Sequence, residues 1–211
     1  MCIRDSPLID ENELKQFYFD SECSYTDDNE NIPLKKTYGH YFTNILNKYD
    51  VQTNSFLDIG CSNGFILEQA LEFGFKKIVG VEPSTDAIDQ ASPSVKPFIL
   101  NGMFDEKMFK KDSFDMITFF QTFDHIVDPN VFLQNCFNVL KDNGFILAIN
   151  HNANSFSAKL LGEKSPIIDI GHAYLYDLTT MRKIFEQNNF LVHSVFPIQN
   201  VVSIERLIQL L

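Results

Sequence analysis

The stretch FLDIGCSNGF, residues 56–65, decides the fold class. Its first four residues, from Phe56 to Ile59, are typical of a short buried strand. A loop of small and polar residues follows between Gly60 and Gly64, and glycine is the residue that allows positive φ angles or close approach of a ligand to the backbone. A helix is expected from Phe65 onward. A strand, a glycine loop and a helix in this order predict a ligand-binding site at the end of the strand.

The composition predicts one folded domain of α/β size. The chain has 211 residues, of which 45% are hydrophobic, and this is enough for a sizeable core. Its 28 acidic residues outnumber the 17 basic ones, which gives a formal net charge of -11. Because no run of Lys and Arg opposes this charge, we expect neither nucleic acid nor an anionic membrane as a partner.

The sequence predicts neither a membrane span nor a metal site. No apolar stretch reaches the roughly 18 residues that a spanning helix needs, and the N-terminus lacks the pattern of a secretory signal. The cysteines are scattered without a CxxC pair, so we expect reduced thiols rather than zinc ligands or disulfides. We therefore expect a cytoplasmic protein without a bound metal. The four cysteines are Cys2, Cys23, Cys61 and Cys136.

Strands and helices alternate regularly after an N-terminal lead-in. The lead-in covers residues 1–50 and is expected to contain one helix over about 37–49, and the ligand-binding domain covers residues 51–211. A further helix is expected to open at Asp128-Pro129 and to end at Asn143-Gly144. This alternation predicts a mostly parallel, twisted sheet with helices on both faces, which is a Rossmann-like α/β fold. Strands are expected at 56–59, 77–81, 97–100, 115–120, 145–149 and 190–196, and the other helices at 65–73, 85–91 and 178–188.

Two classes of cofactor fit the glycine loop. Glu82 ends the second strand 22 residues after Gly60, where an acid can accept both hydrogen bonds of a ribose diol. A dinucleotide brings an anionic pyrophosphate and favours G-x-G-x-x-G/A with no acid beside it. Here Ser62 replaces the second glycine, Phe65 replaces the third, and Asp58 precedes the first. Because Asp58 would attract the sulfonium and ammonium groups of S-adenosylmethionine, its charge favours that cofactor.

Residues from about 55 to 196 resemble class I S-adenosylmethionine-dependent methyltransferases. Their first motif, acid-x-G-x-G/S-x-G, is similar to residues 58–64. Val81-Glu82-Pro83-Ser84 is similar to the ribose-binding acid and its turn, and Asn101-Gly102-Met103-Phe104 to the segment that packs the adenine. Phe114-Asp115-Met116-Ile117 stands where the fourth strand of that family begins, and Leu140 to Gly144 where it has "LKPGG". The resemblance implies cofactor contacts from Asp58, Gly60, Cys61, Ser62, Gly64, Phe65, Glu82, Pro83, Met103, Phe104 and Gln121.

Several of these residues keep a purely structural alternative. Gly60 and Gly64 could serve only a tight turn, and Met103 and Phe104 fit core packing as well as adenine contact. Cys61 is expected to be a small loop residue rather than a nucleophile, because no basic group adjoins it to lower its pKa. The family usually completes its sheet with a last antiparallel strand, and this chain ends soon after the sixth expected strand. The sequence leaves open whether that strand is missing or the tail forms a helix.

Histidines are the candidates for the acceptor side of the site. Gln121 to His125 is similar to the family's segment that ends in "EH" before "DP", so His125 is expected to line the pocket unless it only packs. Ser165 to Tyr176 resembles a segment of methyltransferases encoded with sugar-nucleotide and surface-polysaccharide genes. It also resembles sugar C-methyltransferases, in which an "HEH" stretch positions and deprotonates the sugar. His172 is the one histidine kept here and our first choice as catalytic base, with His125 and His151 as alternatives.

These patterns predict transfer of a methyl group from S-adenosylmethionine to a small polar acceptor, a sugar or sugar nucleotide, at carbon or oxygen. One alternative is an NAD(P)-dependent oxidoreductase on a similar sheet, against which Ser62 and Phe65 count. The other is a non-catalytic cofactor-binding protein, because catalytic bases follow weaker sequence patterns than binding loops. The sequence sets neither the acceptor nor the oligomeric state.

Overall fold

The computed structural model describes residues 28–162, 165, 167 and 171–199, together with Gln16 and Phe19. Expectations for Cys2, Cys23 and the tail 201–211 lie outside these residues. Among the described helices, none has the length and hydrophobicity that crossing a bilayer requires.

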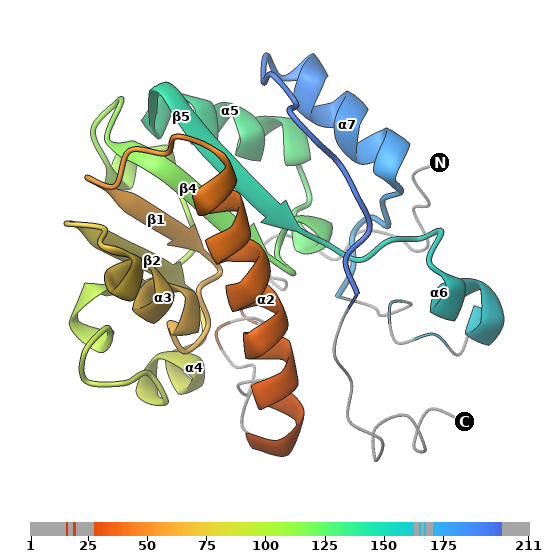
Figure 1. The fold of residues 1–211 in the computed structure, drawn as a ribbon, viewed down its shortest axis with the longest axis horizontal. Coiled ribbons are helices and arrows are strands. Elements are labelled where there is room, and N and C mark those ends of the chain that lie inside the picture. Colours follow the sequence, from red (N-terminus) through yellow and green to blue (C-terminus); the bar gives the residue numbers. More distant parts are fainter. Residues whose placement is uncertain are drawn as a thin grey trace.

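A five-stranded parallel sheet forms the centre of the domain (Figure 1). Its strand order is β3-β2-β1-β4-β5, so β2 and β3 lie on one side of β1 and β4 and β5 lie on the other. Every neighbouring pair of strands is parallel. This confirms the predicted Rossmann-like α/β fold. The strands are β1 (Phe56–Ile59), β2 (Ile78–Glu82), β3 (Ile99–Asn101), β4 (Phe114–Phe120) and β5 (Leu140–Ile149).

Helices cover both faces of the sheet, as predicted (Figure 1). Successive strand residues point to opposite faces, so Phe56 packs with α2 and α3 while Leu57 packs with α5. Each face therefore has its own apolar core. The helices are α2 (Asp28–Lys48), α3 (Phe65–Phe73), α4 (Thr85–Asp89), α5 (Pro129–Val139), α6 (Phe156–Leu161) and α7 (Leu178–Gln187), with 3-10 turns η1 (Lys96–Phe98), η2 (Glu106–Met108) and η3 (Phe123–His125).

Two predicted helix boundaries were wrong. The N-terminal helix begins at Asp28 rather than near residue 37. Helix α5 ends at Val139, and Asn143 and Gly144 belong to β5. There the pairing of β4 with β5 jumps from Phe114↔Leu140 to Met116↔Phe145, and Asn143 has a φ of 61°. The Asn-Gly pair thus serves an irregularity inside the strand instead of the end of the helix.

The sixth predicted strand was also wrong, because residues 190–199 are described without strand pairing. The rings of His193 and Phe196 contact the α2 side of the domain. The ring of His193 stacks on Phe145 with centroids 5.7 Å apart, and Phe196 lies 6.1 Å from Tyr41 of α2. These ring contacts hold the segment against one face, where it forms no ladder with β5.

Candidate active site

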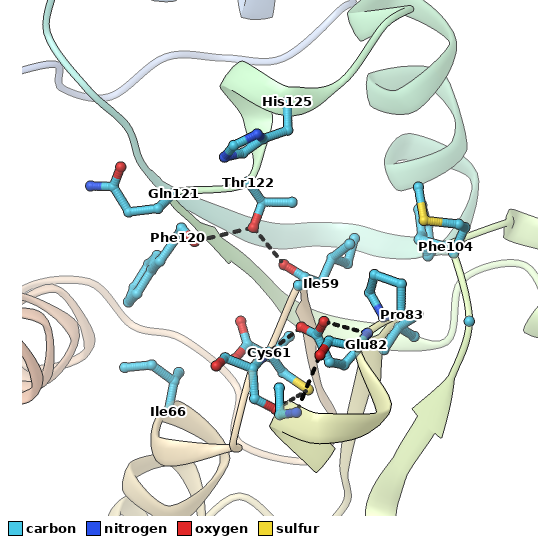
Figure 2. A pocket seen from close by; sticks show the side chains of 18 of the residues that line it. Ile59, Cys61, Ile66, Glu82, Pro83, Phe104, Phe120, Gln121, Thr122 and His125 are labelled. Atoms are coloured by element: carbon cyan, nitrogen blue, oxygen red, sulfur yellow. Dashed lines mark hydrogen bonds between the residues drawn. The ribbon is translucent and has the colours of Figure 1, made fainter. Parts of the chain in front are cut away.

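A cavity of about 310 Å³ opens at the carboxyl ends of the central strands (Figure 2). Ligands of open parallel sheets bind at this edge, where the strand order reverses. Its wall includes every predicted cofactor residue except Gly64. These lining residues are Asp58, Gly60, Cys61, Ser62, Phe65, Glu82, Pro83, Met103, Phe104 and Gln121.

The loop after β1 needs glycine at both predicted positions. Gly60 has a φ of 70°, and a Cβ there would lie 2.4 Å from Oγ1 of Thr122. Gly64 has a φ of 77° and caps the N-terminus of α3, and its Cβ would lie 2.9 Å from Val95. Ser62 also has a positive φ, 49°, which is unusual for a residue with a side chain. The tight-turn interpretation therefore accounts for Gly64, whereas Gly60 serves the turn and the cavity wall together.

Glu82 fixes the same loop through both of its carboxylate oxygens. Oε2 accepts a hydrogen bond from the backbone N–H of Ser62 at 2.8 Å, and Oε1 accepts one from Ser84 at 2.9 Å (Figure 2). Burial raises the pKa of Glu82 although these bonds oppose the rise. Each carboxylate oxygen can accept a second bond. Glu82 is thus already oriented and keeps capacity for a ribose diol.

Asp58 is a buried carboxyl group at the cavity. Its Oδ1 accepts a hydrogen bond of 2.6 Å from the hydroxyl of Thr118 on β4. Burial raises the pKa of Asp58 to about 7, with a smaller contribution from the charge of Glu82. A cation bound beside Asp58 would favour its ionised form.

Gln121 presents an acceptor atom that the described residues do not satisfy. Its Nε2 donates to the hydroxyl of Tyr38 on α2 at 2.8 Å, which fixes the amide. Its Oε1 is buried and has no hydrogen-bond partner in the described part of the chain, and the same holds for Oδ1 of Asn63. Buried acceptors rarely stay unpaired. An ammonium donor such as that of S-adenosylmethionine therefore fits beside Gln121 in the cavity.

Phe104 combines core packing with a place in the cavity wall. Its ring meets Phe132 edge to face with centroids 5.7 Å apart, and it lines the cavity beside Met103. Cys61 is buried, and a Cβ on Gly80 would lie 2.5 Å from its Sγ. Burial, followed by the charges of neighbouring carboxylates, raises the pKa of the Cys61 thiol well above its usual value. This raised pKa disfavours the thiolate form that a nucleophile needs.

The predicted histidines lie together, but only one of them lines the cavity. His125 forms part of the wall, on the far side of Thr122 from Glu82 (Figure 2). Its Nδ1 donates to the backbone carbonyl of Gly171 at 2.8 Å, and burial lowers the pKa of His125. The ring of His172 lies behind it, with centroids 4.7 Å apart. His151 is next to His172, with centroids 4.9 Å apart.

Asp124 is the main residue that the sequence analysis missed. Its side chain is 1% exposed, and its Oδ2 lies 2.6 Å from Nδ1 of His151 and 3.7 Å from Nε2 of His172. These partners lower the pKa of Asp124 against the opposing effect of burial. The available signal was its position beside His125 after β4. Asp124 does not line the cavity, whereas the following residues do so without having been predicted as cofactor contacts: Ile59, Ile66, Val81, Ser84, Ala87, Gly102, Phe120, Thr122, Ile126 and Phe132.

Comparisons with known proteins agree with this geometry. Residues 34–195 match a family of methyltransferase domains. A ubiquinone biosynthesis O-methyltransferase of Bradyrhizobium diazoefficiens is 30% identical over 112 residues, which cover 50% of this chain and 44% of that protein. The chain thus spans about half the length of the curated relatives it matches.

Solved structures show the same fold. A SAM-dependent methyltransferase from Archaeoglobus fulgidus superposes with a TM-score of 0.60 at 20% identity, covering 94% of this chain and 90% of that one. Another from Aquifex aeolicus gives a TM-score of 0.59 at 16% identity, covering 90% and 94%. This chain belongs to the methyltransferase domain family, and it has the fold of these solved methyltransferases.

Proposed function

We propose that this chain methylates a hydroxyl group of a small polar acceptor of the sugar or sugar-nucleotide class. One observation carries the proposal. The cavity wall combines two kinds of group: the acceptors Asp58, Glu82 and the unsatisfied Oε1 of Gln121, and the imidazole of His125, which lies on the far side of Thr122 from Glu82. The acceptors suit a cationic cofactor, and the imidazole suits an acceptor that must lose a proton.

The residues predicted to bind the cofactor hold it by complementary charge and hydrogen bonds. When bound, S-adenosylmethionine supplies a methyl group on a positively charged sulfur. Asp58 and Gln121 face its ammonium group in this proposal, and Glu82 accepts from its ribose. Met103 and Phe104 then cover the adenine. These contacts fix the position of the methyl carbon, which is the main contribution a protein makes to an in-line displacement.

His125 is placed to take the proton of the acceptor. Because its Nδ1–H donates to the carbonyl of Gly171, its Nε2 is the ring atom that takes part in proton transfer. The transfer forms the bond between the acceptor oxygen and the methyl carbon and breaks the carbon–sulfur bond, whose electron pair stays on sulfur. The hydroxyl proton passes to the imidazole. His172, our first choice of base from the sequence, lies next to His125, with the two ring centroids 4.7 Å apart.

The relatives support oxygen as the methylated atom, because those matched here are named O-methyltransferases. Their names also give a second candidate acceptor, a hydroxylated aromatic ring of the ubiquinone type. The sugar class rests on the likeness of residues 165–176 to sugar methyltransferases. The two acceptor classes therefore need a direct comparison.

An acceptor panel tests the proposal. The protein is incubated with labelled S-adenosylmethionine and, in parallel, neutral sugars, sugar nucleotides and dihydroxybenzoate, and label transfer is measured. Transfer to a sugar or sugar nucleotide that is lost in His125→Asn supports the proposal. Transfer to the dihydroxybenzoate alone would replace the sugar class. A parallel titration with S-adenosylhomocysteine and NAD checks the cofactor independently of any acceptor, and binding of NAD alone would reject it.

A further inference from the structure

We propose that Asp124, His151 and His172 form a binding site for one divalent transition-metal ion next to the cavity. One potential ligand atom from each residue lies within 4.8 Å of the other two. Two imidazoles and one carboxylate are a ligand set of Zn²⁺, Co²⁺, Mn²⁺ and Fe²⁺. The sequence prediction of no metal rested on the cysteines alone, and none of these three residues is a cysteine.

The three ligands come from separate segments that the fold joins. Asp124 belongs to η3 after β4, His151 follows β5, and His172 precedes α7. The backbone N–H of Tyr174 donates to the carbonyl of Asp124 at 3.1 Å, and that of Ala153 donates to Tyr176 at 2.8 Å. These bonds tie all three segments together around the carboxylate. Backbone hydrogen bonds therefore hold the three segments, and with them the three ligand residues, close together.

The hydrogen bonds of His172 suggest that a cation belongs at this place. Its Nδ1 lies 2.8 Å from the carbonyl oxygen of Ile167 and must donate, because a carbonyl only accepts. In the neutral ring, Nε2 then carries a lone pair, and it lies 3.7 Å from Oδ2 of Asp124. Two acceptors facing each other in a buried place repel unless a cation or a proton lies between them. Metal-ligating histidines commonly donate their other ring N–H to a backbone carbonyl in this way.

The distances need only a small adjustment for a metal. Nitrogen and oxygen ligands about 2.0–2.2 Å from Zn²⁺ lie roughly 3.3–3.6 Å apart in a tetrahedral site. The distance of 3.7 Å between His172 and Asp124 is close to this range. The 2.6 Å contact of His151 with Asp124 is a hydrogen bond and would have to open by less than about 1 Å. The metal would replace the proton on Nδ1 of His151, so binding should release a proton.

An ion at this site would lie behind His125, which separates the cluster from the cavity. Its positive charge, acting across the His125 ring, would favour the ionised form of an acceptor hydroxyl held near His125. This role rests on the proposed function, whereas metal binding itself does not.

Metal titration tests the site without any acceptor. The protein is stripped with a chelator and titrated with Zn²⁺ by calorimetry and with Co²⁺ by absorption, because imidazole ligation gives Co²⁺ a visible spectrum. We expect one equivalent to bind, and Asp124→Asn and His172→Gln each to weaken binding by more than about tenfold. His40→Gln is the matched control, because His40 is exposed on α2 and bonds only locally to Asn44. Absence of binding, or equal affinity in the ligand variants and His40→Gln, would overturn the site.

Two further measurements guard the interpretation. Circular dichroism and S-adenosylhomocysteine affinity check that the ligand variants are folded, and His151→Gln offers a third ligand variant if one of the others is not. Turnover with and without the chelator then tests the role of the ion. A bound metal whose removal leaves turnover unchanged would keep the site and overturn its role in the transfer. If the unsubstituted protein does not bind S-adenosylhomocysteine, that result would instead count against the proposed function.

Discussion

Cofactor binding should weaken about tenfold when the pH is lowered from about 8 to about 6, because Asp58 then gains a proton. This carboxyl group is buried at the cavity, and burial raises its pKa from 3.8 to about 7. Only the ionised form attracts the sulfonium and ammonium groups of S-adenosylmethionine. The free domain therefore has to lose a proton from Asp58 before this attraction exists.

The size of the effect follows from the fraction of ionised Asp58. A group with a pKa of about 7 is roughly nine-tenths ionised at pH 8 and one-tenth ionised at pH 6. The apparent Kd rises in proportion as the competent form becomes rarer, which gives about tenfold or about 1.4 kcal/mol. The effect of pH on the folding stability of the free domain has the opposite sign. A raised carboxyl pKa stabilises the free domain at low pH, and this contribution is lost as the pH rises from 3.8 through about 7.

Calorimetric titration with S-adenosylmethionine at several pH values measures this dependence. Asp58→Asn keeps the shape of the side chain but cannot ionise, so its affinity should be weak and independent of pH in this range. Thr118→Val removes the hydrogen bond that favours the ionised form, so it should move the midpoint to higher pH.

Two results would refute this reasoning. The first is an unchanged pH dependence in Asp58→Asn, which would assign the titration to another group. The second concerns an analogue that lacks the amino group. Asp58→Asn should weaken S-adenosylmethionine more than this analogue, and equal losses would show that Asp58 does not act through charge.

Three further predictions concern the loop, the ribose and the acceptor side. Glu82→Ala should leave the domain folded and raise the Kd of S-adenosylhomocysteine roughly ten- to hundredfold in calorimetry, since charged hydrogen bonds contribute about 1.5–3 kcal/mol; unchanged affinity rejects the ribose role. Gly60→Ala should lower the free energy of unfolding by about 1–3 kcal/mol, because its φ is 70° and its Cβ meets Thr122, whereas the helical Gly39→Ala should not. Comparable denaturation midpoints for the two variants would contradict this. His125→Asn should lower turnover by roughly 10²–10⁴, as for loss of a general base, while thermal stability and S-adenosylhomocysteine affinity stay nearly unchanged; lost stability with preserved turnover would make His125 structural and return the role of base to His172.

The sequence predicted those parts of the fold whose signals are local. Strand β1 and helix α3 have the bounds that were expected, because Gly60, Gly64 and Gly74 mark their ends by positive φ angles. The charge of Asp58 likewise favoured S-adenosylmethionine over a dinucleotide before any geometry was known. Both inferences depend on neighbouring residues alone.

The sequence failed where distant segments decide the structure. The apolar residues between Phe190 and Phe196 suggested a half-buried strand, but a strand also needs a partner, and Leu191 and Phe196 are exposed. The rings of His193 and Phe196 pack against Phe145 and Tyr41 instead. Periodicity carries no information about this choice, because it does not identify the segment that an apolar side chain will contact.

The acceptor side shows the same limit in its chemistry. Asp124 beside His125 looked like one more motif residue, and His151 and His172 looked like rival candidates for one role. The fold brings their ligand atoms within 4.8 Å, so the three side chains form one cluster. A single histidine substitution therefore changes the surroundings of a buried carboxylate as well as removing an imidazole. Turnover alone cannot separate these effects, and only a ligand-specific signal such as the Co²⁺ spectrum assigns each residue its part.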